Sequence, residues 1–455
     1  MKFFYYLFLL IILFVHSFTR AQAIDTTDGW NNLDAILKNI IPPSFPDKDY
    51  DVTKFGAVGD GITDCSQAFK DAIEICSKNG GGRVVIPEGK FLTGAIYLKS
   101  NVNLYLSKGS TLLFSTDKNK YLPVVYTRFE GVECMNYSPF IYAYDEVNIA
   151  ITGSGTINGQ ADTSNWWKWK KSYRQDNAQL QEWSANNTPV KDRIFGDGHW
   201  LRPNFIQPYN CKNVLIDSIT IINSPMWEIH PVLSQNVTVS NVIINSNGPN
   251  NDGCDPECSK DVLIKNCFFN TGDDCIAIKS GRNDDGRRVN VPSENIIVQN
   301  CVMKDGHGGV VIGSEISGNI RNIYAENCIM DSPHLDRALR FKTNSIRGGV
   351  VENIYFRNIK IGQVKEAVLI IDYNYEEGDK GDFTPVMQNI KVKNITCEKA
   401  PYAILVNAYK RSPVKNLQLE NCIFNNIQNE NVLENVEGLI LKSVIINGKD
   451  AESMK

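Results

Sequence analysis

The chain has 455 residues, of which 42% are hydrophobic and 22% are charged, and its formal net charge is −4 at pH 7. This composition is typical of a folded globular protein and excludes an intrinsically disordered chain. The acidic balance also argues against a nucleic-acid-binding protein, because the molecule as a whole would repel polyanions.

The first 23 residues, MKFFYYLFLLIILFVHSFTRAQA, are predicted to form a cleaved signal peptide. Lys2 precedes an apolar stretch from Phe3 to Val15, and Ala21–Ala23 has the small-residue pattern that a signal peptidase cuts. A membrane anchor would need about 20 apolar residues, whereas this run has 13. Cleavage would remove Lys2 and Arg20 and change the net charge from −4 to −6. We therefore expect a secreted or periplasmic protein without a membrane segment in its mature form.

After an N-terminal extension at 24–48, the segment DCSQAFKDAIEICSKNGGG is predicted to form a helix followed by a turn. Asp64 and Gln67 have the spacing of a capping pair. One face of the helix carries the apolar residues Phe69, Ala72, Ile73 and Cys76. Because no Gly-Lys-Ser or Gly-Lys-Thr follows Gly80–Gly82, these glycines are interpreted as a helix-to-strand turn and not as a phosphate loop.

Residues 116–205 interrupt the repeat pattern of the chain and are interpreted as loop insertions over one rim of a groove. They contain the sequence WWKWKKSYR, from Trp166 to Arg174. Exposed Trp faces suit the apolar faces of sugar rings, so one interpretation is a sugar platform. The alternative is a loop that packs on itself.

From residue 213 onward one short phrase recurs. Each copy has a polar or small opening residue, a short β-rich alternating run, and Asn or Ser five residues later. The copies open at Asn213, Asn236, Asp261, Asn295, Asn322, Asn353, Asn389, Asn416 and Gly438. Their spacings, between 22 and 36 residues, indicate a solenoid of stacked coils.

Period-2 alternation of Val, Ile and Leu indicates that the coils consist of strands. Asn at the bends suits left-handed turns, and stacked Asn side chains can hydrogen-bond to their copies one coil away. The sequence therefore predicts an all-β fold, a parallel β-helix spanning 49–450 as one domain. The helix at the N-terminal end would cover the open edge of the first coil.

Twelve cysteines in an exported chain suggest disulfides. Four of them follow Asn at equivalent points of the repeat and are predicted to stack as small apolar side chains: Cys267, Cys301, Cys328 and Cys422. Cys254 and Cys258 are close enough in sequence to pair, and the sequence leaves this open. Neither spacing nor nearby His supports a zinc site.

Two adjacent aspartates, Asp273 and Asp274, stand directly before the apolar run CIAI. Neighbouring carboxylates repel each other where water is scarce, so this placement requires an explanation. Asp273 lies 12 residues into the coil that opens at Asp261, and His307 lies 12 residues into the next coil. Equivalent positions of neighbouring coils are about 4.8 Å apart. The imidazole is therefore expected to lie near the carboxylates.

Two further residues are expected on the same side of the coils. Asp252 lies 16 residues into the coil from Asn236, and Arg340 lies 18 residues into the coil from Asn322. Other basic residues surround this groove, namely Lys279, Arg282, Arg287, Arg288 and Lys342, partly offset by Asp284 and Asp285.

Clustered carboxylates have two chemical uses. One is a Ca²⁺ site with oxygen ligands; the other is glycoside hydrolysis, in which one carboxylic acid protonates the leaving oxygen and another carboxylate activates water. A solvated acidic turn is the remaining explanation of the Asp pair. Adjacent Arg and Lys favour a uronic acid substrate over a neutral sugar, because guanidinium pairs with carboxylate.

Four motifs in this order resemble the signature of the polygalacturonases, glycoside hydrolase family 28. They are NND at Asn250–Asp252, GDD at Gly272–Asp274, GHG at Gly306–Gly308 and RFK at Arg340–Lys342. The family shows Asn-Thr-Asp, Gly-Asp-Asp, Gly-His-Gly and Arg-Ile-Lys, so Asn251 and Phe341 depart from it. The upstream DVTKFGAVGDGITD is similar to the opening of the wider group of pectin-degrading β-helix proteins.

The resemblance implies a right-handed parallel β-helix that hydrolyses α-1,4-linked galacturonan with inversion and without a metal or another cofactor. It implies that Asp273 is the general acid and that Asp252 and Asp274 position and deprotonate water. His307 would tune the acid. The residues expected to bind substrate are Asn250, Lys279, Arg282, Arg340, Lys342 and Tyr375, with Tyr373 close enough to compete for the last assignment.

The expected partner is an acidic polysaccharide, and the chain is expected to act as a monomer. The extended SGRNDDGRRVNVPSEN and the insertions near 120–205 favour exo action. Three alternatives remain. They are a rhamnogalacturonan hydrolase, a Ca²⁺-dependent pectate lyase and a non-catalytic glycan-binding β-helix. The rhamnogalacturonan hydrolases tend to lack the His and Arg found here at 307 and 340.

Overall fold

The computed structural model describes residues 29–454, so the predicted signal peptide lies outside the described residues. No helix within 29–454 combines the length and the apolar character needed to cross a bilayer.

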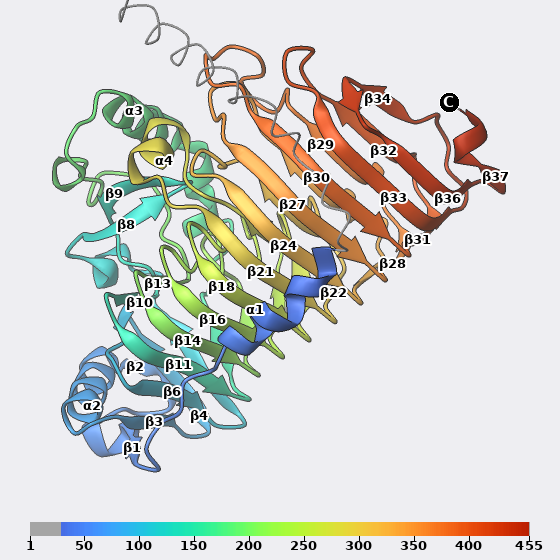
Figure 1. The fold of residues 1–455 in the computed structure, drawn as a ribbon. Coiled ribbons are helices and arrows are strands. Elements are labelled where there is room, and N and C mark those ends of the chain that lie inside the picture. The colour runs from blue at the N-terminus through green and yellow to red at the C-terminus, as the bar shows by residue number, and fades with distance from the viewer. Residues whose placement is uncertain (1–28, 455) are drawn as a thin grey trace, which may run out of the picture.

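The chain forms a right-handed parallel β-helix whose coils stack from the N-terminal end to the C-terminal end (Figure 1). Within residues 29–454, twenty-six strands make one continuous sheet that bends between two ladders. The first ladder contains β1 (Asp49–Asp51), β3 (Gly82–Ile86), β6 (Val102–Leu106), β11 (Val147–Gly153), β14 (Lys212–Asp217), β16 (Gln235–Ser240), β18 (Lys260–Lys265), β21 (Ser293–Gln299), β24 (Ile320–Glu326), β27 (Val350–Arg357), β30 (Val386–Lys393), β33 (Val414–Phe424), β35 (Val436–Glu437) and β36 (Ile440–Ile446).

The second ladder contains β2 (Asp60–Asp64), β4 (Gly89–Thr93), β7 (Ser110–Phe114), β12 (Thr156–Asn158), β15 (Thr220–Ile222), β17 (Ile243–Ser246), β19 (Phe268–Thr271), β22 (Val302–Met303), β25 (Ile329–Met330), β28 (Lys360–Gln363) and β31 (Thr396–Lys399). It continues in the C-terminal halves of β33 and β36, and β37 (Lys449–Asp450) ends the sheet as an antiparallel neighbour of β36.

The opposite wall carries the functional groove described below. Its early part contains β5 (Ile96–Tyr97), β10 (Ile141–Tyr144) and β13 (Ile206–Tyr209). Its later part contains β20 (Ile276–Ile278), β23 (Val310–Gly313), β26 (Arg337–Lys342), β29 (Ala367–Asp372), β32 (Tyr402–Asn407) and β34 (Val432–Glu434). Single parallel bridges from Ile206 through Ile229 and Cys254 to Ile276 connect the two parts.

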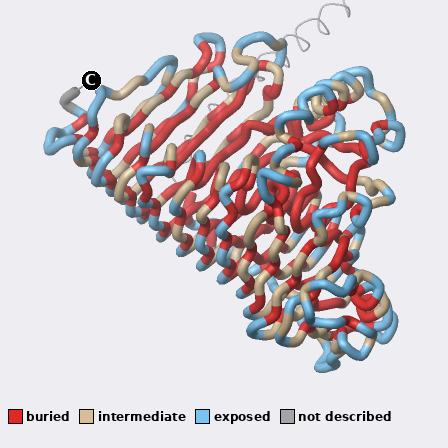
Figure 2. Tube along the Cα trace, turned by 180° about the vertical axis from the view of Figure 1, so that it is seen from behind, coloured by how far each residue is buried: buried red, intermediate tan, exposed pale blue. Residues whose placement is uncertain are grey.

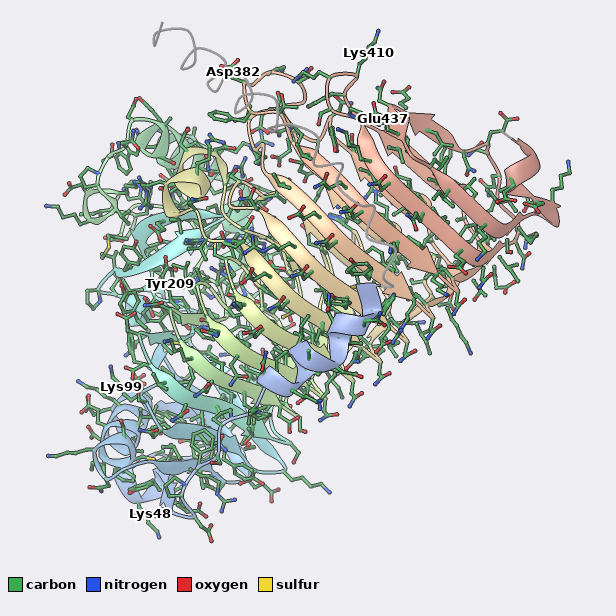
Figure 3. All side chains as sticks on the ribbon, in the orientation of Figure 1. Lys48, Lys99, Tyr209, Asp382, Lys410 and Glu437 are labelled. Atoms are coloured by element: carbon green, nitrogen blue, oxygen red, sulfur yellow. The ribbon has the colours of Figure 1, made fainter. Side chains whose placement is uncertain are left out.

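The interior is a continuous apolar core made of the inward side chains of every coil. Buried residues follow the walls along the whole stack, whereas exposed residues concentrate in the loops (Figure 2). Side chains also project outward along the whole stack, from Lys48 and Lys99 near the N-terminal end to Lys410 and Glu437 near the other end (Figure 3). Each outward position is repeated in the next coil, so one outward row can collect residues that are far apart in sequence.

The predicted Asn ladders are confirmed. Asn322 Nδ2 donates to Asn295 Oδ1 at 3.2 Å, and Asn353 Nδ2 donates to Asn322 Oδ1 at 3.4 Å. A second row, five residues on, bends the chain between the two ladders in the left-handed region, as at Asn300 (φ 56°) and Asn358 (φ 54°). Short polar side chains tolerate this conformation, which explains why Asn recurs there.

The predicted capping helix is α2 (Ser66–Lys78), and its four predicted apolar residues are buried. The predicted Asp64–Gln67 pair was wrong. The helix begins at Ser66, so Gln67 occupies its second position, and its Nε2 donates to Asp71 one turn later at 2.8 Å. Asp64 instead accepts from Ser66 N at 2.9 Å. Gly80, Gly81 and Gly82 all have positive φ, as a turn between α2 and β3 requires.

The N-terminal extension crosses the outer face of the first ladder. It contains η1 (Gly29–Asn32) and α1 (Leu33–Asn39), which lies over β18 and its neighbours (Figure 1). Trp30 packs with Tyr324 and Tyr355, from two successive coils. This contact buries aromatic side chains that would otherwise project from the wall. The remaining short helices are η2 (Val52–Phe55), η3 (Lys118–Tyr121), η5 (Val190–Asp192) and η6 (Ala451–Met454).

Residues 116–205 are not one uninterrupted insertion, which corrects the sequence interpretation. Strands β10, β11 and β12 form a full coil at 141–158 and pair with strands of the coils on both sides. The true insertions are the antiparallel hairpin of β8 (Val125–Phe129) and β9 (Val132–Asn136), and a segment with η4 (Trp166–Lys171) and α3 (Arg174–Ala185). A further helix, α4 (Asn283–Val289), follows β20.

The tryptophans of η4 do not form an exposed sugar platform. Trp166 and Trp169 are 1% and 5% exposed, and their rings pack against each other with centroids 4.8 Å apart. Trp167 is half-buried, and its Nε1 donates to Ser224 O at 2.8 Å. The alternative of a self-packed loop is therefore the observed one, because indole rings gain more from burial in the core than from exposure.

All twelve cysteines are buried and free. The pairing of Cys254 with Cys258 that the sequence left open does not occur in the structure. Cys267, Cys301, Cys328 and Cys422 follow the second Asn row and pack in the apolar core, as predicted.

Candidate active site

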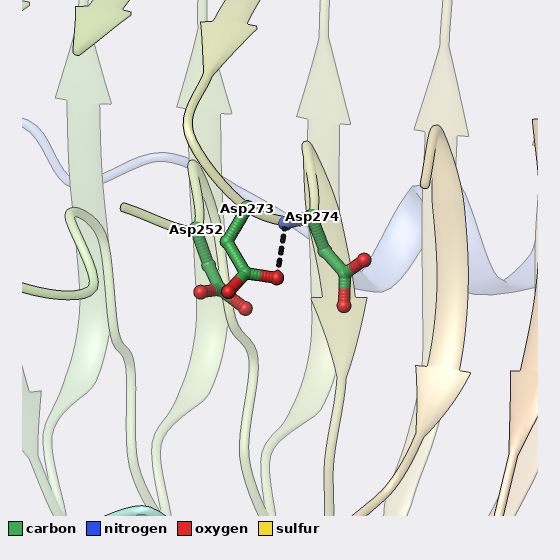
Figure 4. A group of neighbouring side chains, drawn as sticks. All are labelled: Asp252, Asp273 and Asp274. Atoms are coloured by element: carbon green, nitrogen blue, oxygen red, sulfur yellow. Dashed lines mark hydrogen bonds between the residues drawn. The ribbon is translucent and has the colours of Figure 1, made fainter. Parts of the chain in front are cut away.

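Three carboxylates meet in the loops that connect the second ladder to the opposite wall. Asp252 follows β17, and Asp273 and Asp274 lie between β19 and β20. One oxygen of each carboxylate lies within 4.8 Å of the others. The carboxylates of Asp252 and Asp273 lie side by side, and that of Asp274 projects beside them (Figure 4). The predicted register thus brings the carboxylates together.

The loop before β20 is held by backbone contacts that only small residues allow. Asp273 O accepts from His307 N at 3.0 Å and from Thr271 Oγ1 at 2.9 Å. At Gly306 (φ 146°) a Cβ would lie 2.4 Å from this same oxygen. At Gly308 a Cβ would lie 2.4 Å from Val311 Cγ2. Both glycines of the GHG motif therefore allow His307 to approach Asp273 closely.

Asn251, which departs from the family pattern, is a structural residue. Its Oδ1 accepts from Ser246 Oγ at 2.7 Å and Gly248 N at 2.9 Å, and its Nδ2 donates to two carbonyl groups, Ser224 O and Met226 O. It is fully buried. The side chain thus fixes the loop that carries Asp252, and the departure does not remove a group from the pocket.

His307 is the exposed member of the site. Its Nδ1 lies 2.9 Å from Asp273 Oδ1, and 51% of its side chain is exposed, against 16% for Asp273. The hydrogen bond to Asp273 raises the pKa of His307, which outweighs the opposite effect of partial burial. Asp273 Oδ1 also accepts from Asp274 N at 3.0 Å. Asp273 is therefore oriented from two sides and faces the pocket.

Asp274 is a buried carboxylate held by two cations. Lys342 Nζ donates to its Oδ2 at 2.7 Å, and Arg340 Nη1 donates to its Oδ1 at 3.2 Å. Burial alone would raise the pKa of Asp274, but Lys342, Arg340 and Lys279 outweigh burial and hold the pKa well below its usual value. Asp274 is thus charged at neutral pH.

Asp252 is in the opposite electrostatic situation. Burial and the neighbouring carboxylates of Asp255 and Asp273 raise its pKa well above the usual value, although Lys279 Nζ lies 3.7 Å away. Lys279 also pairs with Glu315 at 3.4 Å and lies over the Trp227 ring at 4.5 Å. Burial and like charge thus favour the protonated form of Asp252, whereas the cations favour the ionised form of Asp274.

The other predicted site residues occupy different parts of the same pocket. Tyr375 lines it, with Lys342 Nζ 5.1 Å from its ring centroid, whereas Tyr373 is buried in the core. Asn250 Oδ1 accepts from Lys170 Nζ at 2.5 Å and from Arg202 Nη2 at 2.7 Å. This leaves the Asn250 amide nitrogen as the group available to a ligand.

Arg282 lines the pocket but is shared among three acids, Glu130 at 3.3 Å, Glu376 at 3.4 Å and Glu377 at 3.5 Å. Arg287 and Arg288, which the sequence placed in the basic neighbourhood, do not line the pocket. Arg287 pairs with Asp284 and lies over the Phe383 ring, and Arg288 pairs with Glu133 and Asp285. They fix α4 instead.

Sequence reasoning missed the pocket residues that come from insertions or lie beside strand ends. They are Glu130, Lys170, Tyr173, Trp227, Ser314, Glu315 and Glu376. Lys170 and Tyr173 lie inside the WWKWKKSYR segment. Its tryptophans suggested a sugar platform, whereas its lysine is the residue that reaches the pocket. Glu130 and Glu376 occupy no position of the repeat from which their place in the pocket could be predicted. Ion pairs across the fold bring them there.

The spacing of the three carboxylates would suit a metal ion, but the side chains that already contact them do not. Hard divalent ions require several unoccupied oxygen ligands. Both oxygens of Asp274 already accept from cationic side chains, and Lys279 lies beside Asp252. Three positive charges thus surround the position that a divalent ion would take, and the donor set does not fit a metal site.

Comparisons with known proteins identify the family of the chain. Residues 76–444 match the model of the family described as "Glycosyl hydrolases family 28". The chain is similar to a solved exopolygalacturonase from Thermotoga maritima, with 46% identity, a TM-score of 0.90, and coverage of 92% of this chain and 96% of that one. It is also similar to a probable polygalacturonase of Vitis vinifera (29% identical, 81% of this chain, 72% of the relative). An exo-poly-alpha-D-galacturonosidase of Dickeya chrysanthemi is also similar (29% identical, 82% of this chain, 65% of the relative). The chain belongs to glycosyl hydrolases family 28.

Proposed function

We propose that this protein hydrolyses α-1,4-galacturonosyl linkages in galacturonan and its oligomers, starting from chain ends. The observation that carries the proposal is that Asp252, Asp273 and Asp274 lie together with several cationic side chains in one pocket. Carboxyls supply acid and base, and cations suit a substrate that carries a carboxylate on every sugar. The names of the similar proteins support the same substrate class.

In the proposed reaction Asp273 protonates the glycosidic oxygen as its bond to the anomeric carbon breaks. We assign this role to Asp273 because it faces the pocket and is held by His307. A water oxygen adds to the anomeric carbon and gives its proton to a carboxylate, so that the group recovers the proton that it supplied.

A proton must be on Asp273 when the bond breaks, and Asp252 must be ionised to accept the proton of water. Closely spaced carboxyls titrate together, so transfer of a proton from Asp252 to Asp273 would leave Asp252 ionised. The raised pKa of Asp252 makes it the better acceptor for the proton of water, whereas the cations beside Asp274 make that carboxylate a weak base. Asp274 would then orient water, and Asp252 would deprotonate it.

Inversion at the anomeric carbon is part of the proposal and rests on the family resemblance. The nearest carboxylate oxygens, within 4.8 Å, are closer than the separation of about 6.5 to 9.5 Å typical of inverting glycosidases. Proton NMR of the first product decides the point. We expect β-configured galacturonate from an α-linked substrate, and an α-configured first product would refute inversion.

Exo action is supported by the loops around the pocket. Arg282 joins the β8–β9 turn, through Glu130, to the loop after β29, through Glu376. Asp285 of α4 accepts from Glu133 N at 2.8 Å and from Arg193 Nη1 at 2.8 Å, so the hairpin and α4 are tied together. Insertions therefore enclose one side of the carboxylate group, which restricts the position of a long chain.

Arg340 and Lys342 are proposed to bind the substrate carboxylate with the donors that Asp274 does not use. A guanidinium has five N–H donors and an ammonium has three. Tyr375, Asn250, Lys279 and Arg282 complete the proposed substrate contacts.

The decisive experiment is digestion of defined oligogalacturonides, followed by reducing-end assay and chromatography of early products. Exo action predicts that one small product accumulates from the first time points and that the remaining substrate shortens stepwise. A broad early distribution of oligomers would indicate endo action. The absence of new reducing ends, with tight binding retained, would indicate a glycan-binding protein.

We also propose that the protein is exported and acts as a monomer. The N-terminal sequence supports export. N-terminal sequencing of the exported protein should begin near residue 24, and light scattering should give the mass of one chain.

A further inference from the structure

The cations of the pocket differ in whether an acid compensates their charge. Lys279 pairs with Asp252 and Glu315, and Arg282 pairs with Glu130, Glu376 and Glu377. Arg340 and Lys342 both pair with Asp274. Each of these positive charges is therefore at least partly neutralised by the protein.

Lys170 is the exception. Among residues 29–454, no carboxylate oxygen lies within 4.0 Å of its ammonium group, although the side chain lines the same pocket. Its contacts are the neutral Asn250 Oδ1 at 2.5 Å and the Tyr173 ring, whose centroid is 4.7 Å away. An amide oxygen and an aromatic face orient an ammonium group without cancelling its charge.

The segment that carries Lys170 is held in place. Trp166 and Trp169 on either side are buried, and Trp167 Nε1 donates to Ser224 O at 2.8 Å. Asn250, the residue that Lys170 contacts, is further fixed by Arg202 at 2.7 Å. The ammonium group is thus placed before any ligand binds, which lowers the entropic cost of binding.

Lys170 lies on the opposite side of the carboxylates from Arg340 and Lys342. Asn250 belongs to the coil that opens at Asn236, whereas β26, which carries Arg340 and Lys342, lies three coils later. Asp252 belongs to the same coil as Asn250, and Asp273 and Asp274 belong to the next coil, which lies between Asn250 and β26. Lys170 contacts Asn250, whereas Arg340 and Lys342 contact Asp274, so the cations flank different residues of the pocket.

We propose that Lys170 binds the carboxylate of a second galacturonosyl unit, across the scissile bond from the unit held by Arg340 and Lys342. The inference rests on the proposed function and deepens it, because it makes the site selective for a substrate that is acidic on both sides of the bond. An uncompensated ammonium group in a partly enclosed pocket binds a carboxylate more strongly than one that already has an acid partner.

The test compares Lys170→Met, which keeps an unbranched side chain but removes the charge, with Lys170→Arg, which keeps the charge. Lys168→Met is the matched control, because Lys168 lies on the same short helix and is exposed. Each change is made in an Asp273→Asn background, and the dissociation constants of trigalacturonate and of its methyl ester are measured by calorimetry. Turnover of trigalacturonate by the corresponding single variants is measured in parallel.

We expect Lys170→Met to weaken trigalacturonate binding about tenfold or more, as for loss of a charge-assisted hydrogen bond, and to leave methyl-ester binding nearly unchanged. KM should rise with little change in kcat. Lys170→Arg should retain most of the affinity, and Lys168→Met should behave as the wild type.

Equal losses on the acid and the ester would show that Lys170 only positions Asn250, and unchanged binding of both would overturn the inference directly. These results are distinct from failure of the proposed function, which would appear as absence of new reducing ends with the wild-type protein.

Discussion

Lys342 Nζ lies 2.7 Å from Asp274 Oδ2, so a cation that the sequence motif associates with substrate also keeps one carboxylate of the site charged. Arg340 shares that task at 3.2 Å. The surroundings thus shift the two pKa values in opposite directions, with that of Asp274 lowered by the cations and that of Asp252 raised by burial.

Asp274→Asn should destabilise the protein and abolish turnover. The change leaves Lys342 and Arg340, both nearly buried, without their carboxylate. Breaking a buried ion pair by removing one partner costs about 3 kcal/mol or more. Chemical denaturation at pH 7.5 measures the loss, and a stability equal to that of the wild type would contradict the assignment of Asp274 as a buried charged partner.

Asp252→Asn should abolish turnover but increase stability at neutral pH. The pKa of Asp252 is raised in the folded state, so the wild type loses stability as pH rises above the ordinary carboxyl pKa. Asn removes this cost, and Lys279 keeps Glu315 as a partner. Thermal unfolding should show a rise in Tm of about 2 °C at pH 7.5. The difference should vanish near pH 3, where both folded and unfolded wild type are protonated.

Asp273→Asn should reduce kcat by at least about a thousandfold, because it removes the proposed proton donor and almost no volume. Binding of oligogalacturonides and the free energy of unfolding should stay close to wild-type values, since Asp273 is partly exposed. Kinetics, calorimetry and denaturation together check this combination. Near-normal activity would remove Asp273 from the mechanism.

His307→Gln should destabilise the protein more at pH 6 than at pH 9. The hydrogen bond to Asp273 raises the folded-state pKa of His307, so the stabilisation is fully present below about pH 6.5 and is lost as pH rises through the raised value. The effect should stay below about 1 kcal/mol because half of the side chain is exposed. Parallel unfolding curves across this range provide the measurement, and a pH-independent difference would contradict the proposed pairing.

Chelators should leave activity unchanged. The oxygens of Asp274 already accept from Lys342 and Arg340, so the carboxylates do not offer the free ligand set that Ca²⁺ needs. Reducing-end release is measured with and without EDTA. Loss of activity that Ca²⁺ restores, together with a rise in ultraviolet absorbance from an unsaturated product, would instead support a pectate lyase.

The repeated phrases were sufficient to predict the coils, because strand alternation and the Asn turns are local properties. Even the missed coil at 141–158 has the same opening residue, Asn148, with Gly153 where other copies have Asn. The sequence also predicted which residues meet. One coil places equivalent positions one strand spacing from the next, so Asp252, Asp273 and His307 could be brought together by counting along the chain.

Counting residues along the repeat could not predict the electrostatic role of each carboxyl or the residues that form the walls of the pocket. Whether Asp252 or Asp274 carries the charge depends on which cation lies within a few ångströms of each, and Lys170, Glu130 and Arg282 reach the pocket through packing of insertions outside the repeat. By itself the sequence determined the fold, the family and the carboxylate cluster, since these follow from short-range periodicity and register. Only the tertiary structure decided the charge state of each carboxyl and the composition of the walls, because charge and burial act through space between segments that no repeat aligns.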